Sequence, residues 1–189
     1  MKLSERYSRQ IMIEPIGEAG QKKLSQASVL LVGVGGLGSP IALYLTGAGV
    51  GRLGLIDGDV VSESNLQRQV LYTEEEIGRP KAECARRRLQ ALSSTTEIDV
   101  YPYFLTRDNA LRIIQNYDIV VDGCDNFATR YLIDDCCRET GKPYVYGTIG
   151  EFRGQASVLT TGEVSAIETF ILMRWSLLPV LLSLEVCWG

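Results

Sequence analysis

Four glycines lie within six residues, directly after a short run of mostly branched apolar side chains, in the stretch VLLVGVGGLGSP at residues 29–40. The apolar run, Ala27 to Val32, has the pattern of a strand buried on both faces of a parallel sheet. The Ser-Pro pair that closes the stretch predicts the start of a helix, which Gly47 and Gly49 stop. The sequence therefore predicts a strand, a tight turn and a helix in succession.

The same alternation of strand-like and helix-like segments continues to residue 148, with the short connections of βαβ units. The expected strands are 53–56, 98–104, 118–121 and 144–148, and the expected helices are 81–92, 108–116 and 126–140. We therefore predict an α/β fold, with a Rossmann-like doubly wound, mostly parallel sheet, helices on both faces and an N-terminal helical arm. Ligands of such sheets bind outside the carboxyl ends of the strands.

Three parts are expected along the 189 residues: an N-terminal arm at 1–26, a Rossmann-like domain at 27–159 and an atypical apolar tail at 160–189. The tail approaches the length of a membrane helix, but Arg174 and Glu185 interrupt it, and a charge at mid-membrane costs about 2.5–3.5 kcal/mol. We expect a buried or interface segment and no membrane partner. A truncated gene, an altered reading frame and a genuine short variant all remain open as its origin.

Composition removes several classes of function. The chain has no histidine, which excludes histidine-based triads, histidine metal sites and an imidazole general base. Its net charge of −4, without a long basic block, argues against a nucleic-acid partner. The five cysteines form no C-x-x-C pair and no charged-then-apolar leader precedes Arg6, so we expect no structural zinc and a cytoplasmic protein with reduced thiols. Cys84, Cys136 and Cys137 are expected to be packing residues in helices.

The glycines Gly33, Gly35, Gly36 and Gly38 match the G-x-G-x-x-G pattern between a strand and a helix. Glycines in this position let phosphates approach backbone N–H groups at the positive end of a helix dipole. Asp57 closes the next strand about 20 residues further on, as expected of an acid that binds ribose hydroxyls. This combination suits NAD as well as ATP, and a tight turn without any ligand is the alternative.

A group of cationic and amide side chains then argues against a nicotinamide site. Asn65, Arg68 and Gln69 lie on the connection that leaves the carboxyl edge of the sheet, and Lys81 follows a proline in the first turn of a helix. A lysine is unfavourable at a helix N-terminus unless it reaches an anion. Because arginine and lysine both bind phosphate oxygens, the group predicts a triphosphate, although each cation alone is also compatible with a solvated surface.

Asp125 is the candidate metal ligand. One carboxylate together with phosphates fits magnesium, which takes one or two carboxylates and keeps several waters. Asp122 competes for this role, and an acid placed just before Asn126 is also able to cap the helix that follows.

Five ordered motifs then carry a resemblance: RYSRQ (6–10), GVGGLG (33–38), DGDVVSESNLQRQ (57–69), GRPKAE (78–83) and DGCDNFATR (122–130). Over about residues 6–158 the chain resembles the ThiF/MoeB/HesA adenylyltransferases, which are related to ubiquitin-activating enzymes. The resemblance implies ATP-dependent adenylation of the C-terminal glycine of a small ubiquitin-like sulfur-carrier protein that ends in Gly-Gly (ThiS- or MoaD-like), with release of pyrophosphate. It also implies a homodimer and a role in thiamine or molybdopterin biosynthesis, with general similarity leaning toward thiamine.

The resemblance also implies residue roles. The catalytic residues would be Arg9, Arg68, Lys81 and Asp125, with Asp125 on magnesium and Arg9 reaching into the partner subunit's site. The nucleotide-binding residues would be Gly33, Gly35, Gly36, Gly38, Asp57, Ser64, Asn65, Leu66, Gln67, Arg68, Lys81, Asp125 and Asn126.

The chain departs from the family in two ways. It lacks both C-x-x-C pairs and the further cysteine that many members carry, and after GQASVLTTG (154–162) it no longer looks like the family. Carrier docking is therefore left open. The alternatives are a nucleotide-binding module without catalysis and an NAD(P)-binding oxidoreductase domain.

Overall fold

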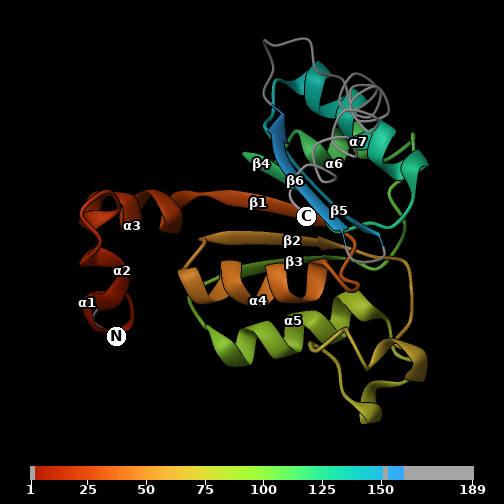
Figure 1. The fold of residues 1–189 in the computed structure, drawn as a ribbon, viewed down its shortest axis with the longest axis horizontal. Coiled ribbons are helices and arrows are strands. Elements are labelled where there is room, and N and C mark those ends of the chain that lie inside the picture. Colours follow the sequence, from red (N-terminus) through yellow and green to blue (C-terminus); the bar gives the residue numbers. More distant parts are fainter. Residues whose placement is uncertain (1–2, 151–152, 160–189) are drawn as a thin grey trace, which may run out of the picture.

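The computed structural model describes residues 3–150 and 153–159, which form one six-stranded sheet with helices on both faces (Figure 1). The strands are β1 (Ser28–Val32), β2 (Arg52–Ile56), β3 (Glu97–Tyr101), β4 (Ile119–Asp122), β5 (Tyr144–Gly150) and β6 (Arg153–Leu159). Their order is β3-β2-β1-β4-β5-β6, and every neighbouring pair is parallel except β5 and β6. The Rossmann-like, mostly parallel fold is confirmed.

Helices α4 (Gly38–Ala48) and α5 (Lys81–Leu92) lie on one side of the sheet, and α6 (Ala110–Ile114) and α7 (Phe127–Thr140) lie on the other (Figure 1). Two short 3-10 helices, η1 (Glu63–Asn65) and η2 (Glu74–Glu76), lie between β2 and α5. The core consists of two hydrophobic clusters, one under each helical layer. Strand β1 supplies both of them, since Leu30 belongs to one cluster and Leu31 to the other, which explains its unbroken apolar sequence.

Several element boundaries differ from those expected. Helix α4 begins at Gly38 with Leu37 as its N-cap, so Ser39 lies inside the helix instead of capping it, and Gly47 is helical too. Only Gly49 ends α4, with a left-handed φ of 89° that suits glycine. Strand β3 ends at residue 101 and α6 covers only residues 110–114, both shorter than expected.

Strand β6 was not anticipated. It pairs antiparallel with β5 at the edge of the sheet, and its side chains are exposed or only half-buried. An edge strand of this kind lacks the continuous apolar run that marks the central strands. The expected tail at 160–189, with Cys187 in it, lies outside the described residues. Within residues 3–150 and 153–159, no helix has the length and hydrophobicity needed to cross a membrane.

The N-terminal arm consists of α1 (Leu3–Arg6), α2 (Ser8–Ile11) and α3 (Gly17–Gln26), and it is fastened to the end of α4. The buried ring of Tyr7 packs against Gly49, where a Cβ atom would collide with it. The amides of Gln10 and Gln21 both donate to the carbonyl of Ala48, at 3.1 and 3.0 Å. Because helices of a βαβ unit run opposite to the strands, the arm lies at the amino end of the sheet, as Figure 1 shows beside the start of β1.

One hydrogen-bonded carboxylate joins the starts of β1 and β4 and gives a first prediction. Asp118 Oδ2 accepts hydrogen bonds from the backbone N–H and the hydroxyl of Ser28, at 2.8 and 2.6 Å, and these bonds lower the pKa of Asp118. Since the folded pKa is below the unfolded value of about 3.9, the carboxylate stabilises the fold above that pH and less as pH falls through the folded pKa. We expect Asp118→Asn to cost about 0.5–1 kcal/mol at pH 7, a small value because the site is exposed.

Urea unfolding of Asp118→Asn and wild type from pH 7 to pH 2.5 measures this effect. The difference between the two proteins should shrink as the pH falls below 4. The exposed Asp108→Asn is the matched control and should show little difference at any pH. A penalty for Asp118→Asn that stays constant across this range would contradict the assignment.

Candidate functional site

A cavity of about 620 Å³ opens at the carboxyl ends of the strands, where the fold predicts a ligand site. Its walls come from the loops after β1, β3 and β4, from the connection between β2 and α5, from the first turns of α5 and α7, and from the end of β5 and the start of β6. The expected site residues that line it are Gly33, Gly35, Gly36, Asp57, Arg68, Lys81, Asp125 and Asn126.

The glycines of the loop after β1 divide into two pairs. Gly33 has a φ of 85°, and a Cβ atom on it would lie 2.8 Å from the carbonyl oxygen of Gly123 in the loop after β4. A Cβ on Gly38 would collide with the carbonyl of Gly33. These two glycines allow the turns after β1 and β4 to pack closely, and Gly38, although expected at the site, does not line the cavity.

Gly35 and Gly36, in contrast, leave backbone open to the cavity. A Cβ on either would meet only side chains, Gln69 Nε2 beside Gly35 and Arg68 Nε beside Gly36, each at 3.5 Å. Arg68 Nη1 donates to the carbonyl of Ser64 at 3.0 Å, which holds the guanidinium near the loop. The arrangement leaves room for an anion against the backbone, with a cation at its side.

Asp57 holds this loop in place. Its Oδ2 accepts a hydrogen bond from the N–H of Val34 at 2.8 Å, and its Oδ1 accepts one from the N–H of Asp59 at 2.8 Å. The hydroxyls of Tyr72 and Ser39 donate to the carbonyl of Val34, at 2.7 and 3.2 Å. Burial raises the pKa of Asp57, and the two N–H donors oppose that rise. Its carboxylate therefore shapes the loop and also faces the cavity.

Lys81, the first residue of α5, has a buried side chain whose Nζ lies 3.1 Å from Asp59 Oδ2. The anion that compensates a lysine at this helix end is thus the Asp59 carboxylate, whose own side chain is 56% exposed. Both residues line the cavity. Because Asp59 is well solvated, the pair is weak, and Nζ is available to a ligand of higher charge.

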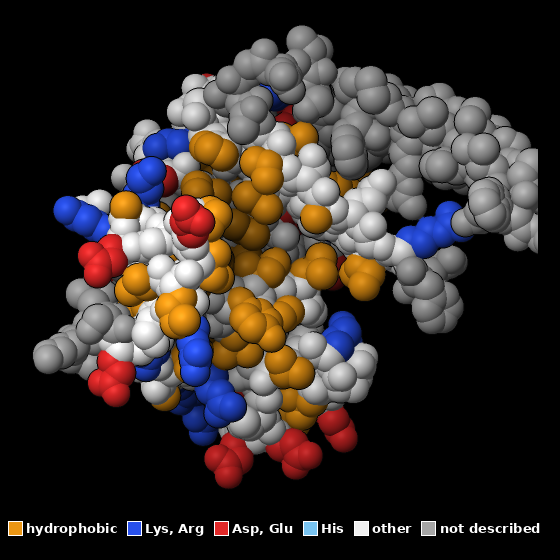
Figure 2. Space-filling view, turned by 60° about the vertical axis from the view of Figure 1, so that its left-hand side comes forward, with side chains coloured by type: hydrophobic (Ala, Val, Ile, Leu, Met, Phe, Trp, Pro, Cys, Tyr) orange, Lys and Arg blue, Asp and Glu red, His pale blue; other side chains and the backbone are white. Residues whose placement is uncertain are grey.

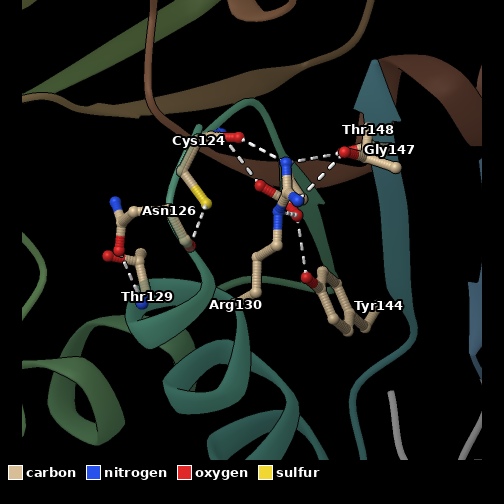
Figure 3. A network of polar contacts seen from close by, with 8 residues as sticks. Cys124, Asn126, Thr129, Arg130, Tyr144, Gly147 and Thr148 are labelled. Carbon is tan, nitrogen blue, oxygen red and sulfur yellow. Dashed lines mark hydrogen bonds and ion pairs between the residues drawn. The ribbon is translucent and has the colours of Figure 1, made fainter. Parts of the chain in front are cut away.

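Asp122, the competing metal ligand, accepts three hydrogen bonds within the protein, and Figure 3 shows Cys124, Arg130 and Tyr144, which donate them. Its carboxylate accepts hydrogen bonds from Arg130 Nε at 3.2 Å, from the hydroxyl of Tyr144 at 2.9 Å and from the N–H of Cys124 at 2.8 Å. Arg130 also donates to Thr148 Oγ1 and the carbonyl of Cys124. Burial raises the pKa of Asp122 and these partners oppose it. The cluster joins β4, α7 and β5 beneath the cavity.

Asp125 is left as the free carboxylate of this loop. The N-cap of α7 is Asn126, whose Oδ1 accepts from the N–H of Thr129 at 2.9 Å, so Asp125 does not cap the helix. Its side chain is exposed, lines the cavity and makes no hydrogen bond or ion pair to another described residue. Among the described residues no three acidic or cysteine side chains group into a metal site. One carboxylate facing a phosphate site is the donor set that suits hydrated magnesium.

Other expected residues are not brought to the cavity. Ser64, Asn65, Leu66 and Gln67, in and just after η1, do not line it, although Ser64 holds Arg68 through its carbonyl. Arg9 is exposed on α2, at the opposite end of the sheet. Helix α4 alone, with 11 residues, spans about 16 Å of that separation, at 1.5 Å per residue.

The cavity also has an apolar wall that the sequence motifs did not reveal. Phe104, Phe127 and Ile149 line it and are exposed, and Leu105 lies beside them. Phe127 stands within the DGCDNFATR motif, but Phe104 and Leu105 follow β3 and Ile149 lies in β5, far from it along the chain. A pattern search therefore has no means of grouping them.

The four cysteines in the described part of the chain are all buried, which disfavours nucleophilic chemistry. Cys124 lines the cavity, but burial raises its pKa to about 12, so its thiol stays neutral at pH 7. Cys84, Cys136 and Cys137 are buried in helices, which confirms their predicted packing role.

Comparison with known proteins shows which family the chain resembles. The model of the ThiF family matches residues 7–172, which extends the resemblance beyond residue 158. The sulfur carrier protein adenylyltransferase of Thermus thermophilus is 51% identical over 154 residues, covering 82% of this chain and 57% of that protein. A probable molybdopterin-synthase adenylyltransferase of Porphyra purpurea is 44% identical over 152 residues, covering 80% of this chain and 40% of that protein.

Among solved structures, Escherichia coli MccB with ATP superimposes with a TM-score of 0.73 at 26% identity, covering 84% of this chain and 50% of that one. The chain thus spans 57% or less of the length of each of these three proteins. The residues that the family model matches, 7–172, include all those that line the cavity.

Proposed function

The chain belongs to the ThiF family, and we propose that it uses ATP to adenylate the C-terminal glycine of a small ubiquitin-like sulfur-carrier protein. The observation that carries this proposal is the convergence of Arg68, Lys81 and Asp125 on one cavity beside the open backbone of Gly35 and Gly36. Two cations and a glycine loop suit a triphosphate.

In the proposed reaction a carboxylate oxygen of the carrier's terminal glycine attacks the α-phosphorus of ATP. A new oxygen–phosphorus bond forms, the bond from the α-phosphorus to the oxygen bridging the β-phosphate breaks, and pyrophosphate leaves. The attacking carboxylate is ionised at pH 7, so no general base is needed, which fits a chain without histidine. Catalysis then rests on orienting the reactants and on neutralising phosphate charge with Arg68 and Lys81.

Magnesium is the proposed cofactor, and Asp125 is the residue that would hold it. The free, exposed carboxylate of Asp125 at the cavity is the feature that fits this ion. When bound, magnesium would neutralise charge on the phosphate oxygens. Asp57 is proposed to bind the ribose hydroxyls, and Asn126 and the segment from Ser64 to Gln67 are proposed to complete the nucleotide site.

A homodimer is proposed as the working assembly, in which Arg9 acts in the partner's cavity. Arg9 is too far from its own cavity to act there, because the arm is fastened at the other end of the sheet. Exposed apolar side chains on the arm and α4, Met12, Ile13 and Tyr44, are suited to an interface. Figure 2 shows hydrophobic side chains gathered on one face of the molecule, with charged side chains around them.

Residues 27–159 are proposed as the ATP-binding unit, working in the cytoplasm. The pathway is proposed to be thiamine or molybdopterin biosynthesis, and the names of the relatives, which refer to a sulfur carrier and to molybdopterin synthase, support that class. A nucleotide-binding module without catalysis is the second candidate, because the groups that line the cavity suit nucleotide binding whether or not a carrier protein is adenylated.

Magnesium-dependent exchange of pyrophosphate into ATP tests the proposal. We expect exchange only when a carrier protein ending in Gly-Gly is added, because the reverse reaction needs the acyl adenylate. ThiS-like and MoaD-like carriers, added one at a time, separate the two pathways. A carrier with its last glycine deleted is the control and should give no exchange. ATP binding without exchange for any carrier would support the non-catalytic module instead.

A further inference from the structure

The side chain of Gln69 lies in the cavity wall with unused hydrogen-bonding capacity. The residue is only 3% exposed, and its carbonyl oxygen Oε1 is buried without a hydrogen-bond partner in the described part of the chain. Its amide nitrogen Nε2 lies 3.5 Å from the position that a Cβ on Gly35 would occupy. Gln69 and Gly35 both line the cavity.

Such an amide destabilises the protein that carries it. A buried polar atom without a partner loses its bonds to water and gains none in return, whereas an apolar side chain of similar shape avoids this loss. Within residues 3–150 and 153–159, the other buried side-chain atoms without a partner are the hydroxyls of Thr46 and Thr96, and neither residue lines the cavity. An unsatisfied amide at a ligand site therefore indicates a functional role for that side chain.

The local fold supplies no such reason. The backbone N–H of Gln69 donates to the carbonyl of Asn65 at 2.9 Å, and the carbonyl of Gln69 accepts from the N–H of Tyr72 at 3.2 Å. These bonds form the turn without the side chain. The amide is thus a buried polar group that the turn does not use.

We infer that the side-chain amide of Gln69 is a binding group for the phosphates of the nucleotide. Gln69 Nε2 lies 3.5 Å from the position that a Cβ on Gly35 would occupy, and Arg68 Nε lies 3.5 Å from the corresponding position on Gly36. A phosphate seated on the loop receives a neutral donor from Gln69 and a charged one from Arg68. Because Oε1 is buried, the donor Nε2 is the atom of this amide that meets the phosphate. This inference rests on the proposed use of ATP.

Calorimetric titration of wild type and Gln69→Met with ATP and magnesium tests it. Methionine keeps the length of glutamine but removes both polar atoms. We expect the Kd for ATP to rise about tenfold, as for loss of one hydrogen bond to a charged group, while binding of adenosine changes less than about twofold. The melting temperature without nucleotide should stay equal or rise. The matched control is Gln90→Met, an exposed glutamine on α5, which should leave both Kd values unchanged.

The outcomes separate the inference from the proposed function. If wild type does not bind ATP, the proposed function fails. If wild type binds ATP and Gln69→Met binds it equally well, the inference is overturned and the proposed function stands. If Gln69→Met does not fold, Gln69→Asn replaces it, since its shorter side chain withdraws the amide from Gly35 and should weaken ATP binding to a similar degree.

Discussion

Replacing Lys81 with methionine should lower kcat/KM for carrier-dependent pyrophosphate exchange by roughly 10²–10³-fold, the loss typical of removing one preorganised group that stabilises transition-state charge. Lys81 has a buried stem and lines the cavity, and within residues 3–150 and 153–159 its one ion pair is with the solvated Asp59. When a triphosphate arrives, its higher charge competes for the ammonium group. Methionine fills the same space without the charge, so the fold should lose little stability.

The measurement is the exchange rate at saturating carrier across a range of ATP concentrations, with the melting temperature alongside. Lys22→Met removes a lysine from an exposed position on α3 and should retain full activity. An exchange rate for Lys81→Met within about threefold of wild type would show that Lys81 pairs with Asp59 and does not contribute to the reaction.

The position of Lys81 was predictable because several local signals coincide there. Helix α5 is predicted accurately from the proline before Lys81 and the apolar spacing after it. The central sheet is predicted from the continuous apolar sequence of β1, which is buried on both faces. A central parallel strand can be predicted from its own residues, because both of its faces are buried and its sequence is continuously apolar. Edge strand β6 does not, since its pairing with β5 is a tertiary contact between partly exposed segments.

The site, like the fold, is predictable from sequence only in part. The glycine loop, Asp57, Arg68, Lys81 and Asp125 follow from motif and spacing, and the structure brings them to one cavity. The sequence does not disclose which atoms have spare bonding capacity. From sequence, Asp125 is the candidate metal ligand and Asp122 its competitor, and only the three donors around Asp122 in the structure leave Asp125 as the free carboxylate. Gln69 likewise gains significance only from its burial and its missing partner.

Arg9 gives the second large effect, since Arg9→Ala should reduce pyrophosphate exchange by roughly 10³-fold or more, as expected of an arginine supplied in trans to phosphate chemistry. The loss should leave the fold intact, because Arg9 is exposed and the arm is held instead by Tyr7, Gln10 and Gln21. Arg88→Ala, an exposed arginine on α5, is the matched control and should keep its activity.

Mixing two inactive variants decides whether Arg9 acts on its own cavity or on that of its partner. In a dimer of Arg9→Ala with Lys81→Met, one cavity receives a native lysine from its own chain and a native arginine from the other. Random pairing in a twofold dimer then restores about a quarter of wild-type exchange, since half of the dimers are mixed and each has one complete site. If Arg9 served its own cavity, both sites of the mixed dimer would lack one residue and no activity would return. The rigid attachment of the arm to the far end of α4 favours the first result.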